Sequence, residues 1–107
     1  MTASDDMKAI VATELAKFTD PALKDWSMSL LTEPTQRTFK WEYGDNELFD
    51  GWLIEDMGER NVWAAYCKGG HGALGCPWGI VFKDSPEFGM DSGWYPSLQK
   101  LFDDWFA

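Results

Sequence analysis

The chain has 107 residues, of which 45% are hydrophobic and 16% aromatic, and its nine basic and eighteen acidic residues give a formal net charge of −9. This length fits one compact domain, so we expect a single domain over residues 1–107, and the aromatic content argues against disorder. The negative charge repels phosphates, which argues against direct nucleic-acid binding, and no apolar run is long enough for a membrane span.

The N-terminal segment and the cysteines indicate the compartment. Asp5 and Asp6 lie where a secretory signal would be positively charged, and no apolar segment of the signal type follows them. Cys67 and Cys76 are too few for the disulfide framework of a small secreted domain. We therefore expect a cytoplasmic protein in which both thiols are free.

The first predicted element is a helix over about residues 5–18. Its apolar residues follow helical spacing, at Met7, Ile10, Val11, Leu15 and Phe18. Asp20 and Pro21 then resemble the cap and first residue of a short helical turn that reaches about Lys24. Beyond it, Trp26, Met28 and Leu30 alternate with serines, which predicts a strand.

The middle of the chain is predicted to be a series of strands. Turn residues over 32–36 precede a strand in which Phe39, Trp41 and Tyr43 alternate with polar residues. Residues 44–46 break this strand, and a third strand is expected around 52–55, ending near 57–60.

The last part of the chain combines two strands and a helix. Strands are predicted over 62–67 and 78–82, joined by a glycine-rich loop, and residues from Asp84 to Trp94 read as irregular. A second helix opens at Pro96 and Ser97 and has apolar residues at helical spacing, at Leu98, Leu101, Phe102 and Trp105.

These elements predict the α+β class. Consecutive strands without intervening helices favour an antiparallel meander of four to five strands, with an N-terminal and a C-terminal helix packed on it.

The loop from Lys68 to Pro77 contains the candidates for catalysis, cofactor binding and metal binding. Its G-x-G-x-x-G is followed by a β-type run, not by the helix that a dinucleotide phosphate needs, so we expect no cofactor. Cys67, His71 and Cys76 fall short of the four ligands of structural zinc, so we expect no metal. Glycines around the only histidine argue against a rigid Cys-His pair, so we expect no catalytic residue and no enzyme.

An acidic segment between Trp41 and Glu59 is the main candidate for a binding site. It contains seven acids, no basic residue and interleaved aromatics. An acidic field around aromatic anchors attracts and then holds a basic partner, although the acids alone would also serve to solubilise two strands. The predicted partner-binding residues are Glu42, Asp45, Glu47, Phe49, Asp50, Trp52, Glu55, Asp56 and Glu59, with Trp52 and Phe49 as anchors.

The sequence thus favours a small protein-binding module. In its size, its negative charge and its single domain the chain is similar to bacterial immunity proteins as a broad class, although it shares no motif with them. We therefore expect an inhibitor, antitoxin or immunity-type protein that occludes a basic partner such as a toxin or nuclease. Three alternatives stay open: a nucleic-acid mimic that binds a DNA- or RNA-binding protein, a small-ligand-binding protein or enzyme that uses the His71 loop, and a structural subunit of an oligomer.

Overall fold

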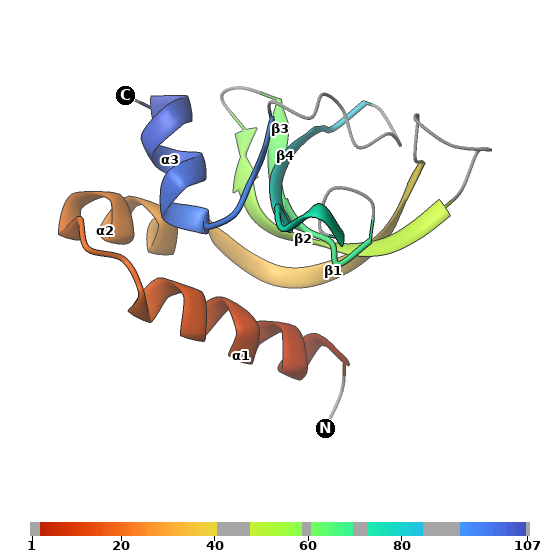
Figure 1. Cartoon of the computed structure of the whole chain (residues 1–107), viewed down its shortest axis with the longest axis horizontal. Coiled ribbons are helices and arrows are strands. Elements are labelled where there is room, and N and C mark those ends of the chain that lie inside the picture. Colours follow the sequence, from red (N-terminus) through yellow and green to blue (C-terminus); the bar gives the residue numbers. More distant parts are fainter. Residues whose placement is uncertain (1–2, 41–47, 59–60, 70–72, 85–92, 107) are drawn as a thin grey trace.

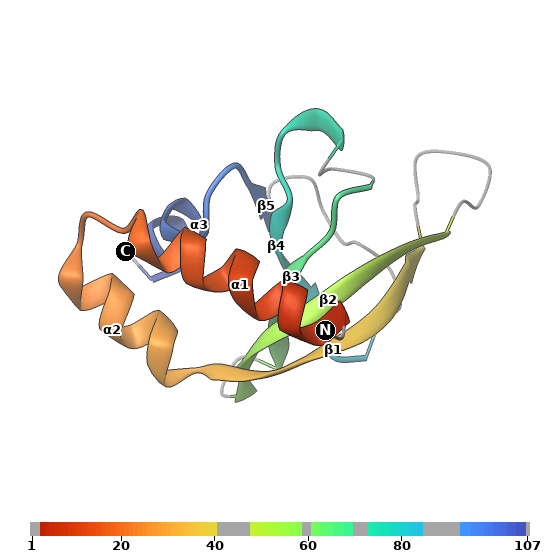
Figure 2. The same cartoon turned by 90° about the horizontal axis from the view of Figure 1, so that it is seen from below.

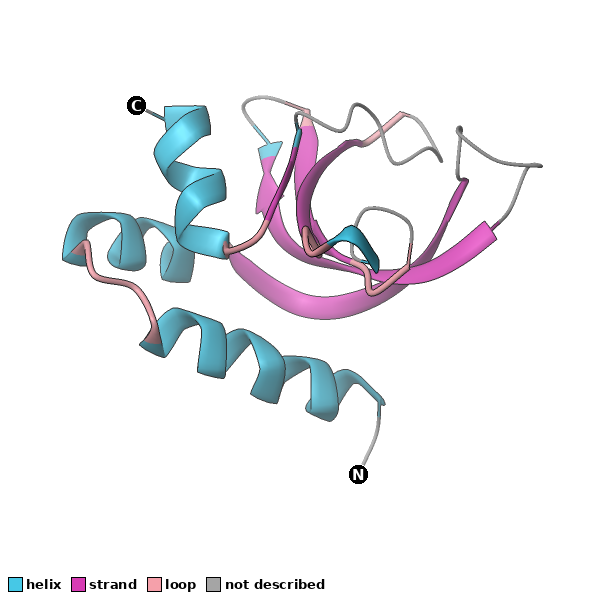
Figure 3. Ribbon diagram, viewed as in Figure 1, coloured by secondary structure: helices cyan, strands magenta, loops and turns pink. Residues whose placement is uncertain are grey.

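The computed structural model describes residues 3–40, 48–58, 61–69, 73–84 and 93–106 (Figure 1). In chain order the elements are α1 (Ala3–Ala16), α2 (Pro21–Ser29), β1 (Leu31–Lys40), β2 (Leu48–Met57), β3 (Val62–Tyr66), β4 (Trp78–Phe82), β5 (Trp94–Tyr95) and α3 (Leu98–Phe106). Each strand pairs antiparallel with the next, in the order β1-β2-β3-β4-β5. The predicted α+β class and the meander sheet with helices at both ends are confirmed (Figure 3).

Residues 21–29 form the helix α2, so the predicted strand at Trp26–Leu30 is wrong. The Asp20 side chain caps this helix by accepting from the backbone N–H groups of its first turn. The inward face consists of Leu23, Ser27 and Leu30, while Trp26 is exposed. Trp26, Met28 and Leu30 alternate with serines although the segment is helical, because Ser27, the central residue of the inward face, is polar.

Residues 31–40 form β1, so the predicted turn at 32–36 is wrong as well. The pairing with β2 is irregular between Leu31 and Thr35, which accommodates the turn-type residues. Pro34 is tolerated because β1 is an edge strand and pairs only with β2. The predicted residues Trp41 and Tyr43 lie outside the described part of the chain.

The two-residue strand β5 was not predicted, whereas β3, β4 and α3 fall where the sequence placed them. Trp94 and Tyr95 pair with Gly79 and Trp78 of β4. A strand this short shows no periodicity in the sequence, because two residues cannot alternate more than once.

One face of the sheet packs against the helices. Figures 1 and 2 show a curved sheet with α1 beneath the convex side of β1 and β2, and with α2 and α3 together at one end. The core on this side combines helical residues with residues of β2 to β5, and its members include Met7, Val11, Leu15, Ile54, Val62, Ile80, Leu98, Leu101 and Phe102. Burial of these apolar side chains is the main term that holds helices and sheet together.

The concave face has a second, smaller core that brings distant strands together. Phe39 of β1 meets Trp94 of β5 edge to face, with ring centroids 6.3 Å apart, although these strands do not pair. The glycines beneath the two rings permit this closeness. A Cβ at Gly51 would lie 2.2 Å from the Phe39 ring, and a Cβ at Gly79 would lie 2.2 Å from the Trp94 ring. The sheet therefore curls far enough for its two edges to share one core.

Two side chains fasten the beginning of α3 to the other helices. The buried Glu14 of α1 accepts a hydrogen bond from the Leu98 N–H (3.0 Å), where a carboxylate also complements the helix dipole. The Gln99 side chain accepts from the Thr19 N–H (2.6 Å) and donates to the Thr19 hydroxyl, at the turn between α1 and α2. These bonds fix the position of α1 over the sheet and hence the wall that its first turns present to β2.

Candidate functional site

Five of the nine predicted partner-binding residues lie in the described part of the chain: Phe49, Asp50, Trp52, Glu55 and Asp56. All five belong to β2. Glu42, Asp45, Glu47 and Glu59 lie outside the described residues, the first three in the sequence that joins β1 to β2.

The two predicted anchors face opposite sides of the sheet. Phe49 packs against the concave core, where its ring lies on Gly69 so closely that a Cβ there would be 2.3 Å away. Trp52 packs against the helix-side core and is half-buried. The structure therefore does not bring Phe49 and Trp52 into one patch. Of these two predicted anchors, only Trp52 lies on the face of the sheet that the helices cover.

Glu55 lies in the interior and is 0% exposed. Leu53 pairs with Ala65 and Glu55 with Ala64, so Ile54 is an extra residue in β2 and forms a β-bulge. Because of this bulge, Ile54 and Glu55 both face the helices, and Ser27 Oγ of α2 lies 3.0 Å from each Glu55 carboxyl oxygen. Burial raises the pKa of Glu55 to about 8, and the Ser27 hydroxyl opposes part of that rise.

Asp56 forms an ion pair with Lys83, whose Nζ lies 2.7 Å from Asp56 Oδ1 and 4.7 Å from the centre of the Trp63 ring. The Asp56 charge is thus matched by a cation of the same chain. Among the predicted acids that the structure describes, only Asp50 is left at the surface without an ion pair, and its carboxylate accepts a hydrogen bond from the Thr38 hydroxyl (3.2 Å).

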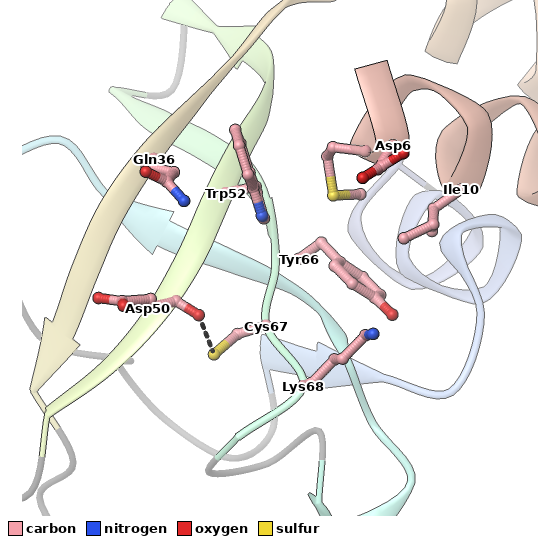
Figure 4. A pocket seen from close by; sticks show the side chains of 9 residues that line it. Asp6, Ile10, Gln36, Asp50, Trp52, Tyr66, Cys67 and Lys68 are labelled. Atoms are coloured by element: carbon pink, nitrogen blue, oxygen red, sulfur yellow. Dashed lines mark hydrogen bonds between the residues drawn. The ribbon is translucent and has the colours of Figure 1, made fainter. Parts of the chain in front are cut away.

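A cavity of about 300 Å³ opens beside Trp52 (Figure 4). The strand register places Gln36 of β1, Trp52 of β2 and Tyr66 of β3 in one row across the sheet. The first turns of α1 form the facing wall. The complete lining is Asp6, Met7, Ile10, Gln36, Asp50, Trp52, Tyr66, Cys67 and Lys68.

The lining of this cavity includes charged side chains of both signs. Among the described residues, the Asp6 carboxylate and the Lys68 ammonium form no ion pair or hydrogen bond, and the Tyr66 ring lies between them in the view of Figure 4. The Tyr66 ring is held in place by Trp78, with ring centroids 4.6 Å apart. Burial is the largest cause of the raised pKa of the Tyr66 phenol. An aromatic floor with a carboxylate at its edge is an arrangement that accepts polar, cationic groups.

Burial disfavours the reactive thiolate form of Cys67. Cys67 is buried, its Sγ donates weakly to the Asp50 carbonyl (3.6 Å), and burial raises the pKa of the thiol. Cys76 is half-buried, and both cysteines are free. Within the described ranges, no three or more His, Cys, Asp or Glu side chains are grouped to hold a metal ion, and His71 lies outside them.

The described part of the glycine-rich loop runs into β4 at Trp78. None of the helices in the described part of the chain has the length and apolar character that crossing a bilayer requires.

Sequence reasoning identified Trp52 and Asp50 but missed Asp6, Gln36, Tyr66 and Lys68 as their neighbours. Asp6 was considered only as an acid of the N-terminal segment, and no local signal shows that α1 begins over β2. The row of Gln36, Trp52 and Tyr66 requires the strand register, which depends on the bulge in β2.

The chain was also compared with known proteins. No protein-family model matches it, and neither the curated proteins nor the solved structures contain a significant match.

Proposed function

We propose that this protein is a binding module for a basic protein partner, and that it acts as an inhibitor, antitoxin or immunity-type protein by covering the partner's basic surface. The observation that carries the proposal is a surplus of negative charge beside an open, aromatic cavity, whose described lining has two carboxylates, Asp6 and Asp50, and one cation, Lys68. Asp6 and Asp50 flank the cavity that Trp52 lines, and neither forms an ion pair among the described residues.

The distribution of cations supports this assignment. Within the part of the chain that the structure describes, four lysines form ion pairs with acids, namely Lys8–Glu33, Lys17–Glu14, Lys83–Asp56 and Lys100–Asp104. These pairs neutralise four acids, and Asp50 near the beginning of β2 is not among them. Surface charge of one sign raises the rate at which an oppositely charged partner arrives.

The sequence between β1 and β2 is acidic. It contains Glu42, Asp45 and Glu47 and no basic residue, and it leads directly into Leu48, which is 65% exposed. An exposed aliphatic side chain next to acids matches the mixture of apolar and polar contacts found in protein interfaces.

A binding role is favoured over catalysis by the state of the described nucleophiles. The Cys67 thiol is buried and its pKa is raised, which disfavours the reactive thiolate. Two free cysteines are also consistent with a reducing compartment, and we propose that the protein acts in the cytoplasm.

The test begins with affinity capture of the partner from lysate of the source cells, followed by measured association and dissociation rates. We expect Asp45→Lys, Glu47→Lys and Asp50→Lys to slow association and to flatten its dependence on salt, with smaller effects on dissociation. Asp103→Lys makes the same change of charge at an exposed position of α3 and is the matched control.

Trp52→Ala separates the anchor from the steering charges. It is expected to speed dissociation and to weaken binding by about 2 kcal/mol or more, as truncation of a buried interface aromatic does. Thermal melts of every variant identify losses that follow from unfolding, because Trp52 also packs on the core. Unchanged rates in all folded variants, or equal effects of Asp103→Lys, would remove this region from the interface. Competition by nucleic acid for the partner would instead identify the chain as a nucleic-acid mimic.

A further inference from the structure

We infer that the cavity beside Trp52 receives an arginine side chain of the basic partner. This inference rests on the proposed function and names the chemical group that the site recognises. It follows from the shape of the cavity, from its aromatic floor and from the Asp6 and Gln36 side chains, which line it and have no partner among the described residues.

The floor of the cavity is suited to a planar cation. Trp52 and Tyr66 are direct neighbours across β2 and β3, and both line the cavity. Trp52 is half-buried, and the contact of Tyr66 with Trp78 restricts its movement. Aromatic faces attract cations through the ring quadrupole, and guanidinium, which is planar and weakly hydrated, stacks on them better than ammonium.

Hydrogen-bond acceptors lie around this floor. The Asp6 carboxylate is at one side, on the wall formed by α1, and the Gln36 amide is at the other, in the strand that pairs with Trp52 (Figure 4). Neither side chain has a hydrogen-bonding partner among the described residues. Guanidinium has five N–H donors in one plane and can serve several acceptors at once, whereas an ammonium is a compact point charge.

The size of the cavity agrees with one side chain. At about 300 Å³ it lies at the lower end of the range for small-molecule sites, roughly 300–1,000 Å³. Met7 and Ile10 contribute apolar surface against which the methylene groups of arginine pack.

The positive charge of Lys68 repels a cationic ligand, so substitution of Lys68 tests whether the ligand is positively or negatively charged. In the view of Figure 4 the Tyr66 ring lies between the Lys68 ammonium group and Asp6. If the ligand is cationic, Lys68→Ala strengthens binding because it removes a like charge. An anionic ligand would require Lys68, and the same substitution would weaken its binding.

The experiment uses N-acetyl-arginine methylamide as the probe, which carries one charge, on the guanidinium. Its matched controls are the citrulline analogue, a neutral isostere, and the lysine analogue. The readout is the NMR signal of the Trp52 indole N–H, because Trp52 is the tryptophan that lines this cavity, and Trp52→Phe assigns the signal. The intact protein is used and no partner is needed.

We expect saturable shifts with the arginine probe, weaker binding of the lysine analogue and no saturable shift with the citrulline analogue. Asp6→Asn is expected to weaken binding of the arginine probe about fivefold, in line with the loss of one ion pair. Lys68→Ala is expected to strengthen binding of the same probe. Asp103→Asn, which removes an exposed carboxylate from α3, is expected to change nothing. Asp6 is exposed, so these variants are expected to keep the fold.

Three results would overturn the inference: equal binding of the citrulline analogue, equal weakening by Asp103→Asn, or no shift of the Trp52 signal up to the solubility limit of the probe. These outcomes are separate from a failure of the proposed function. If charge variants alter partner kinetics but the probe does not bind, the binding module stands without an arginine pocket. If the probe binds and no basic partner exists, the cavity has another cationic ligand and the inference fails as stated.

Discussion

Replacement of Glu55 by glutamine tests whether the carboxyl group beneath α2 is protonated in the native protein. The side chain is 0% exposed, and the Ser27 hydroxyl is within hydrogen-bond distance of both its oxygens. A neutral carboxyl group and this hydroxyl can each donate to the other, so the protonated form satisfies the site without a buried charge. Glutamine has the same shape and is always neutral.

The magnitude follows from the raised pKa. A rise from 4.5 in the unfolded chain to about 8 in the native protein corresponds to about 5 kcal/mol of free energy that depends on pH. Since the folded pKa is the higher one, this contribution to stability is fully present below pH 4.5 and is lost as the pH rises toward 8. The wild-type free energy of unfolding should therefore fall by up to about 1.4 kcal/mol per pH unit within that window.

The assay is urea unfolding of the wild-type chain and Glu55→Gln at intervals from acid to alkaline pH. We expect the two proteins to have similar stability in acid and Glu55→Gln to be more stable by several kcal/mol above pH 8, with a flatter profile. Asp25→Asn, which removes an exposed carboxylate from the same helix, is the control for net charge and should keep the wild-type profile. Parallel profiles for wild type and Glu55→Gln would refute the protonated interior carboxyl.

Two substitutions and one titration test the packing. Gly79→Ala should cost about 1–3 kcal/mol of unfolding free energy, because its Cβ would lie 2.2 Å from the Trp94 ring; an unchanged urea midpoint would contradict the close packing of the concave core. Glu14→Ala should cost about 1–2 kcal/mol by leaving a buried N–H at the start of α3 unpaired, and wild-type thermal stability would show that this bond contributes nothing. Thiol titration in denaturant without reductant should count two thiols, and in the native protein Cys76 should react faster than the buried Cys67; the reverse order would contradict their burial.

Local periodicity predicted most of the fold, and the exceptions have long-range causes. The spacing of Met7, Val11 and Leu15 was sufficient to locate α1, because burial against any core selects the same helical face. In α2 the inward residue is Ser27, whose burial depends on a carboxyl group 28 positions away, so the local pattern was misleading. Helices and strands are both predicted from the spacing of apolar residues, so a polar residue in the core makes either prediction fail.

The candidate site was only partly predictable for the same reason. Trp52 stood out as an aromatic residue in an acidic segment, and the structure places it at a cavity. Glu55 was counted with the surface acids, but the bulge at Ile54 turns it inward. Whether a strand contains a bulge depends on its neighbours, and one added residue reverses the face of every side chain beyond it.

The hydrogen bond from Leu98 to Glu14 joins residues 84 positions apart and therefore affects the order in which parts of the chain fold. Hairpins such as β2–β3 close short loops and form early, whereas this contact closes nearly the whole chain and forms late. During synthesis α1 leaves the ribosome before α3, and its core is incomplete until α3 has emerged. The apolar face of Met7, Val11 and Leu15 is thus the segment on which we expect chaperones to act while the chain is still growing.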